Sequence, residues 1–233
     1  MVKEGYYFGF PPLLAGVLAL GMGGGNGIIV GSLLIFLALF VFSFFRNPER
    51  TIPSGVGLIV SPADGRVVVV KVEENAGRPG KRISIFLAIW NVHVNRSPAA
   101  GTITRLEYKP GKFLAAWAEN ASFENEQNVY ALASEHGEIM FKQIAGYVAR
   151  RVVTWKKTGE TVERGERIGL MRFGSRMDIW LPENAEVAVK VGENVQGGSS
   201  ILARMADIAG VRATCADLSE RAQQKIGEDQ RPA

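Results

Sequence analysis

The stretch Val67-Val68-Val69-Val70-Lys71-Val72 decides the fold class of this chain. Valine is branched at Cβ, and this shape suits the pleated surface of a β-sheet better than a helix. Short runs rich in apolar residues follow, with Gly, Pro and Asn between them, at 83–89, 102–108, 129–132, 138–141, 151–154 and 187–191. Short strands at such spacing are typical of a β-barrel or β-sandwich. Because only 113–121 and the residues after Ile201 have helix-like composition, we expect a mainly β domain with minor helix over residues 54–216.

Two segments of this domain are alike. Residues 61–67 and 157–169 each open on a turn marked by glycine and continue into an apolar run. Both are similar to the flat hairpins of lipoyl- and biotinyl-type domains. A carrier domain of that type needs a lysine at an exposed hairpin tip between apolar neighbours, and no such lysine is evident here. We therefore expect lipoyl-like hairpins without the carrier function, since a shared fold does not fix a function.

The first 45 residues predict a membrane hairpin. No charged residue occurs from Tyr6 to Phe45, and two apolar runs, 11–22 and 28–45, are separated by Gly23-Gly24-Gly25-Asn26-Gly27. The second run is close to the roughly 20 apolar residues that cross a bilayer as a helix. Glycine disfavours helix and permits a tight reversal. The sequence leaves open whether this helical hairpin spans the bilayer or only dips into it.

Charges on either side of the hairpin predict its orientation. Lys3 precedes it, and Arg46 and Arg50 follow it, so the positive-inside rule places both ends in the cytoplasm. We therefore expect the β domain on the cytoplasmic side of the cell membrane, after a Pro-containing linker at 46–53. A signal peptide fits poorly, because Glu4 follows Lys3 and no small-residue cleavage site precedes a polar start. The charged tail, 217–233, is expected to be largely disordered.

The composition of the chain indicates which classes of partner it can bind. The chain has 233 residues, a net charge of +4 and a pI near 9.3, which suits an anionic surface such as phospholipid. Nucleic-acid binding would call for a basic stripe with interleaved aromatic residues, and the sequence has none. Cys215 is the single cysteine, so no intrachain disulfide can form and a reducing compartment is favoured.

Near the end of the domain, Gly197-Gly198-Ser199-Ser200 places a hydroxyl directly after two glycines. Glycine can adopt positive φ and leave its carbonyl open, and a nearby hydroxyl can attack that carbonyl when a base is close. The same stretch is equally a common turn signal. His93 and Asp64 are the candidate partners, although alone each also fits a structural histidine and a turn aspartate.

Three segments taken together resemble the motifs of phosphatidylserine decarboxylase proenzymes of the short prokaryotic class. They are Ser61-Pro62-Ala63-Asp64-Gly65, Val92-His93-Val94-Asn95-Arg96-Ser97-Pro98 and Gly197-Gly198-Ser199-Ser200, in this order. The resemblance covers Arg46 to about Met205, and the apolar N-terminal hairpin is also typical of the family. Supporting stretches lie at 125–128, 143–151 and 172–178.

This resemblance implies a self-processing enzyme. The Gly198–Ser199 bond would be cut, leaving a large β chain and a small α chain that stay together as a heterodimer. Ser199 would become a covalent pyruvoyl group, which forms a Schiff base with the substrate amine and accepts the electrons released with carbon dioxide, the role pyridoxal phosphate fills elsewhere. The implied substrate is phosphatidylserine in the membrane, and the implied product is phosphatidylethanolamine.

Asp64 and His93 would complete a Ser/His/Asp arrangement with Ser199. Asp64 can hold the imidazole tautomer, and His93 can then accept the proton of Ser199 and later reprotonate the substrate carbanion. Longer family members have a second histidine, linked to the cut, where this chain has Arg96. Either His93 covers both roles or another group does. Many members also have Leu-Gly-Ser-Thr at the cut, and Ser200 keeps the hydroxyl of that threonine.

Other interpretations remain at this point. Arg150, Arg151, Arg172 and Arg176 could bind a lipid phosphate or simply form a solvated basic face. The alternatives to the decarboxylase are a membrane-tethered, lipoyl-like binding module without catalysis, which would stay one intact chain, and a decarboxylase acting on an archaeal-type serine ether lipid. A metallopeptidase needs clustered histidines and carboxylates, so no metal is expected. The sequence does not fix the oligomeric state.

Overall fold

The valine-rich run lies in β2 (Gly65–Asn75), which pairs antiparallel with β3 (Arg78–Leu87) along most of its length in the computed structural model of the chain. The structure describes residues 1–75, 78–116, 118, 120–147, 151–172 and 174–205. Both strands belong to an eight-stranded sheet with the order β13-β2-β3-β11-β7-β6-β5-β9. Its other strands are β5 (Gly101–Lys109), β6 (Gln127–Ser134), β7 (Gly137–Ile144), β9 (Thr161–Val162), β11 (Ser175–Pro182) and β13 (Asn194–Val195).

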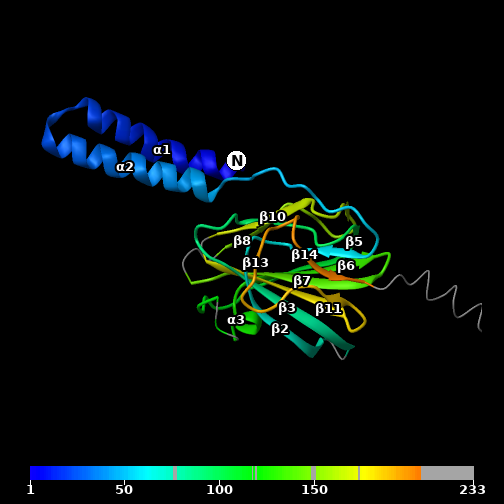
Figure 1. Cartoon of the computed structure of the whole chain (residues 1–233). Helices are drawn as coiled ribbons and strands as arrows, with labels where there is room; N and C mark the ends of the chain where they lie inside the picture. Colours follow the sequence, from blue (N-terminus) through cyan, green and yellow to red (C-terminus); the bar gives the residue numbers. More distant parts are fainter. Residues whose placement is uncertain (76–77, 117, 119, 148–150, 173, 206–233) are drawn as a thin grey trace, which may run out of the picture.

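Two three-stranded antiparallel sheets complete the β domain (Figure 1). In one, β14 (Ile201–Arg204) lies between β1 (Leu58–Val60) and β12 (Glu186–Val187). In the other, β10 (Arg167–Met171) lies between β4 (Val94–Arg96) and β8 (Val152–Thr154). The strand that directly follows the Gly-Gly-Ser-Ser stretch is therefore held on both sides by earlier parts of the chain.

The hydrophobic core lies on one face of the large sheet. Successive residues of a strand point to opposite faces, and in β11 Met177 and Ile179 join the core while Arg176 and Asp178 point away from it. Both sets are buried, because the short helix α3 (Ala121–Glu124) supplies Ser122 to the second face. The prediction of a mainly β fold with minor helix is confirmed.

The N-terminal apolar runs form two antiparallel helices, α1 (Lys3–Gly21) and α2 (Gly24–Phe44), which project from the β domain (Figure 1). The chain reverses between them at Gly23 and Gly24, whose φ angles of 71° and 73° favour glycine. Glycines also let the helices approach closely, since a Cβ at Gly9 would overlap the ring of Phe42. Among the described residues, α2 alone is long and apolar enough to cross a membrane.

The base of the hairpin packs on the β domain through a second hydrophobic cluster. Phe44 and Phe45, at the end of α2, lie against the strands that carry Val94 and Leu170. The backbone N–H of Val2 donates to the carbonyl of Phe45 at 3.1 Å, so the first residues of the chain join the same contact. The hairpin is therefore fixed at its base to β4 and β10.

Two local predictions were wrong within the described residues, a helix over 113–121 and a strand over 187–191, of which only Val187 lies in a strand, β12 (Glu186–Val187). Most of 113–121 is irregular, because the Asn125 side chain bonds both the N–H and the carbonyl of Leu114, at 2.8 and 2.9 Å, and holds a compact loop. Ile201–Arg204 form strand β14, because their backbone pairs with β1 and β12, and the rest of the segment from residue 206 on lies outside the described residues. Cys215 and the tail at 217–233 lie outside the described residues.

Candidate active site

The Gly-Gly-Ser-Ser stretch is a tight turn between β13 and β14. The N–H groups of Ser199 and Ser200 both donate to the carbonyl of Gln196, at 3.1 and 3.0 Å. Gly198 has a φ of 82°, is buried, and donates its N–H to the carbonyl of Ser61 at 2.8 Å. The glycine at this position is therefore required by the backbone, and the turn is held against the segment that precedes β2.

The two serines of the turn differ in their contacts. The hydroxyl of Ser200 accepts a hydrogen bond from the Gln196 N–H at 2.9 Å. The hydroxyl of Ser199 has no hydrogen-bond partner among the described residues, and Ser199 is half-buried. Ser199 thus offers a free nucleophile next to the Gly198 carbonyl.

The carboxylate of Asp64 binds the turn directly. One carboxylate oxygen accepts the Gly197 N–H at 2.7 Å, and the other accepts a hydrogen bond from Arg50 at the same distance. Arg50 also donates to the side-chain oxygen of Gln196 at 3.0 Å. The sequence predicted Asp64 as a site residue, but it suggested for Arg50 only a role in membrane orientation. Nothing local in the sequence shows that the linker returns to this turn.

Arg96 lies directly against Gly198. A Cβ built on Gly198 would be 2.8 Å from Cδ of Arg96 and 3.0 Å from Cδ1 of Ile52. The guanidinium donates to the carbonyls of Gly165 and Pro48, at 2.8 and 3.1 Å. Burial, and then the nearby charges of Arg167 and Arg50, lower the pKa of Arg96 from its ordinary value. Arg96 is thus a direct neighbour of the turn.

His93 is fully buried at the base of the N-terminal hairpin, with its ring centroid 4.2 Å from that of Phe44. Its Nδ1 lies 2.9 Å from the carbonyl of Asn91, so Nδ1 carries the proton. Its Nε2 is buried without a hydrogen-bond partner in the described part of the chain. Burial lowers the pKa of His93 to about 4, so the imidazole is neutral at pH 7 and Nε2 can accept a proton.

The structure therefore brings Asp64 and Arg96 to the turn that holds Ser199 but does not bring His93 into the same hydrogen-bond network. Between described residues, no hydrogen bond joins His93 to Asp64 or to Ser199. The buried ring instead lies under Phe44 of α2.

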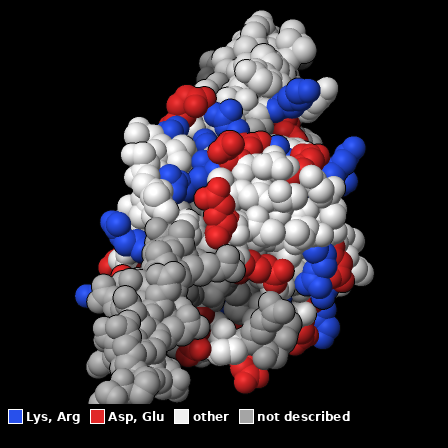
Figure 2. Space-filling model, turned by 90° about the vertical axis from the view of Figure 1, so that its right-hand side faces the viewer, with Lys and Arg blue, Asp and Glu red and all other residues white. Residues whose placement is uncertain are grey.

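The four candidate phosphate-binding arginines have different positions. Arg176 is buried and bonds Asp178 at 2.6 Å and Ser84 at 2.8 Å, so its charge is already compensated on the second face of the large sheet. Arg172 lies over the ring of Phe8, 5.2 Å from its centroid, at the junction with the hairpin. Arg150 lies outside the described residues, and Arg151 begins the segment after that gap. On the face shown in Figure 2, basic and acidic side chains are interspersed.

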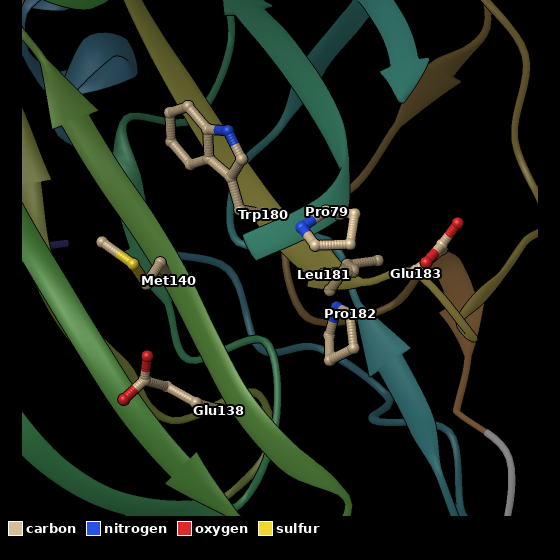
Figure 3. Close-up of a pocket in the computed structure, with 8 residues that line it drawn as sticks. Pro79, Glu138, Met140, Trp180, Leu181, Pro182 and Glu183 are labelled. Carbon is tan, nitrogen blue, oxygen red and sulfur yellow. The ribbon is translucent and has the colours of Figure 1, made fainter. Parts of the chain in front are cut away.

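A cavity of about 190 Å³ lies elsewhere, at one end of β3, β7 and β11 (Figure 3). Its lining includes Trp180, Met140 and the carboxylates of Glu138 and Glu183. None of its lining residues belongs to the turn at 196–200 or touches it through a described hydrogen bond. The cavity is therefore not the candidate active site.

Comparisons with known proteins agree with the motifs. The sequence profile of the family described as Phosphatidylserine decarboxylase matches residues 37–203. A phosphatidylserine decarboxylase proenzyme of Solibacter usitatus is 51% identical over 174 residues, which cover 75% of this chain and 83% of that relative. Proteins of the same name from Symbiobacterium thermophilum and Magnetococcus marinus are 47% identical over 180 residues and 42% identical over 209 residues. These cover 76% and 88% of this chain, and 84% and 95% of the relatives. The chain belongs to the phosphatidylserine decarboxylase family.

Proposed function

We propose that this chain is a proenzyme that cuts itself between Gly198 and Ser199 and then converts phosphatidylserine to phosphatidylethanolamine and carbon dioxide. The observation that carries the proposal is the turn itself, in a chain of this family. It combines a positive φ at Gly198, an unpartnered hydroxyl at Ser199 and a carboxylate, Asp64, bound to the N–H of Gly197.

The cut begins at Ser199. Its oxygen attacks the Gly198 carbonyl carbon while a base takes the hydroxyl proton, and the C–N bond breaks to leave an ester and a free amine. Loss of the Cα proton of residue 199 then breaks its Cβ–O bond and releases Gly198 as a carboxylate. The dehydroalanine that remains takes up water and loses ammonia, which leaves a pyruvoyl group at residue 199.

We assign the proton transfers to His93 and the alignment of the turn to Asp64. The unpartnered Nε2 of His93 is neutral at pH 7 and has a lone pair that no described group occupies. In the uncut chain the ring packs on Phe44, and no described hydrogen bond joins it to the turn. Asp64 already fixes the N–H of Gly197 and the side chain of Arg50.

Residue 199 is half-buried at the edge of the domain, so a pyruvoyl group formed there fits the turn and stays open to a substrate. Such a group supplies a ketone that can bind the amine of the serine head group and take up the electron pair released with carbon dioxide. His93 is also the proposed acid that returns a proton to the product.

The two chains remain associated after the cut because of the sheet order. β14 would belong to the small chain, while its partners β1 and β12 would belong to the large chain. Strand pairing on both sides, together with the core residues Leu202 and Ala203, keeps the small chain in place. This supports the proposed heterodimer.

The hairpin supports a location at the cell membrane, with the β domain on the cytoplasmic side. At its base, Trp90 is 72% exposed, and its carbonyl accepts a hydrogen bond from Arg46 at 2.6 Å. An exposed tryptophan favours the membrane interface, because its ring is largely apolar and its N–H is polar. The substrate would therefore meet the enzyme at the surface from which the hairpin emerges.

Intact-mass analysis and a decarboxylation assay test the proposal together. The wild-type protein should give two chains separating at Ser199 and should release carbon dioxide from phosphatidylserine in mixed micelles. Ser199→Ala should stay one chain and be inactive. Ser200→Ala is the matched control and should still be cut, because that hydroxyl only accepts a bond within the turn. Active wild-type protein that remains a single chain with an unmodified serine would refute the proposal.

A further inference from the structure

Arg96, beside the proposed cut, has two arginine neighbours, and both of these have a carboxylate partner. Arg50 pairs with Asp64 at 2.7 Å, and Arg167 pairs with Glu49 at 2.8 Å. Arg96 lies near both pairs and donates only to the two backbone carbonyls of Gly165 and Pro48. Within the described residues, Arg96 is thus the one cation of this group without an anionic partner.

Arg96 has an unused side-chain donor near Gly198. Its Nε lies 3.5 Å from the position of a Cβ on Gly198, and no described hydrogen bond uses that N–H. The carbonyl oxygen of Gly198 likewise has no described hydrogen-bond donor. Gly198 itself is buried.

The proposed cut changes the charge at this place. Before it, Gly198 is part of a neutral peptide bond. After it, Gly198 ends the large chain as a carboxylate. A buried carboxylate is costly unless a cation and hydrogen bonds compensate it, and a guanidinium gives both in one group. Before the cut the three arginines outnumber Asp64 and Glu49 by one positive charge, and the new carboxylate would balance it.

We propose that Arg96 is the binding site for the carboxylate that self-cleavage creates at Gly198. This rests on the proposed function. Arginine stays protonated throughout the physiological range and is a poor proton acceptor. Arg96 therefore does not take over the proton transfers expected of a histidine at this position. It stabilises the cut form relative to the uncut form, and it holds the end of the large chain beside the turn.

The test compares the effect of one substitution on the cut and the uncut protein. Arg96→Gln is made in the wild-type chain and in Ser199→Ala, and the melting temperature of each is measured. Arg96→Gln should lower the melting temperature of the cut protein by roughly 5 °C more than that of the uncut protein, because only the cut protein has the buried carboxylate. Arg96→Lys should restore part of the difference.

Arg164→Gln is the matched control. Arg164 also donates to linker carbonyls, those of Pro53 and Gly55, each at 2.7 Å, but it has no described contact with Gly198. It should lower the melting temperatures of the cut and uncut proteins equally. Equal losses for Arg96→Gln in both forms would show that Arg96 only supports the fold, and would overturn the proposal.

A second format keeps the test decisive if Arg96→Gln blocks the cut. Residues 1–198 and 199–233 are co-expressed as two chains, so that the carboxylate exists without any self-cleavage. Arg96→Gln should then weaken retention of the small chain about tenfold on dilution, and Arg164→Gln should not. Unchanged retention refutes the role of Arg96. Failure of the proposed function appears differently, as a single uncut wild-type chain by mass.

Discussion

At the scale of single residues, the buried imidazole of His93 couples the stability of the domain to pH. Burial lowers its pKa to about 4, whereas an unfolded histidine has a pKa of about 6.5. Between these values the unfolded chain binds more protons, so the free energy of unfolding falls as the pH falls from about 6.5 to about 4. Below both values the loss is complete, and it is on the order of 3 kcal/mol for this group.

His93→Gln in the uncut Ser199→Ala chain should therefore flatten the fall of the melting temperature between pH 6.5 and pH 4.5. The uncut background separates this effect from self-cleavage. His136→Gln is the control, since it removes a histidine that is not buried in the described structure. Parallel pH profiles for His93→Gln and its parent would contradict a neutral, buried imidazole.

Asp64 makes a different residue-scale prediction, because it acts on the geometry of the turn. Asp64→Asn keeps an oxygen for the Gly197 N–H but removes the charge that holds Arg50. Small displacements of reacting groups are costly, so self-cleavage should slow on the order of 100-fold, as followed by the conversion of precursor into two chains after a pulse of synthesis.

Glu49→Gln is the matched control for Asp64→Asn. It breaks the comparable ion pair with Arg167, and it leaves the described contacts of the turn intact. Precursor conversion should proceed at nearly the wild-type rate in Glu49→Gln. If both variants convert equally fast, Asp64 has no special role in aligning the turn.

At the scale of elements, the sequence predicted several strands of the large sheet, but it missed β11 at the centre of that sheet and β14 between β1 and β12. The valine-rich run became β2, and the runs at 102–108 and 129–132 lie in β5 and β6. In β11, Arg176 and Asp178 alternate with core residues, which in the sequence would indicate a strand with one exposed face, but the structure buries both faces. Their burial depends on Ser84 and Ser122, which lie far away in the sequence.

Some residues of the candidate site could be predicted from the sequence, and others could not. Gly198, Ser199 and Asp64 could be predicted because each belongs to a short motif. The contacts of Arg50 and Arg96 with this turn could not, because they depend on how the linker and β4 pack around it. A local pattern carries no information about two charges that meet only after the three sheets have assembled.

The hairpin provides the prediction at the scale of elements. Gly9→Leu should force α1 away from Phe42, since even a Cβ at Gly9 would overlap that ring. Overpacking of this kind costs about 1–3 kcal/mol, so the melting temperature in detergent should fall by several degrees. Gly21→Leu, at a helical glycine with no atom within 4 Å of its Cβ position, should leave it unchanged. Equal melting temperatures for both variants would mean that the two helices do not pack as described.

At the scale of the whole molecule, the hairpin and the β domain form one unit. The base of α2 lies on β4 and β10, and β4 also carries Arg96 to the proposed cut. A bilayer that holds α2 would therefore hold the turn at a fixed height above the lipid. The exposed side chain of Trp90 lies in the loop between β3 and β4. This loop contacts the hairpin base, because the Trp90 carbonyl accepts a hydrogen bond from Arg46.

This arrangement predicts that Trp90 matters for lipid in a bilayer but not for the chemistry. Trp90→Ser should leave self-cleavage and the decarboxylation of detergent-dispersed substrate near the wild-type values, because Trp90 has no described contact with the turn. It should lower decarboxylation in phosphatidylserine vesicles severalfold, since an exposed tryptophan gains free energy at the interface. Phe123→Ser is the control, because Phe123 is 66% exposed on α3, beside the large sheet and away from the hairpin base (Figure 1). Equal activities of the two variants on vesicles would show that the domain does not approach the bilayer through the loop of Trp90, and that the hairpin alone delivers the enzyme to its substrate.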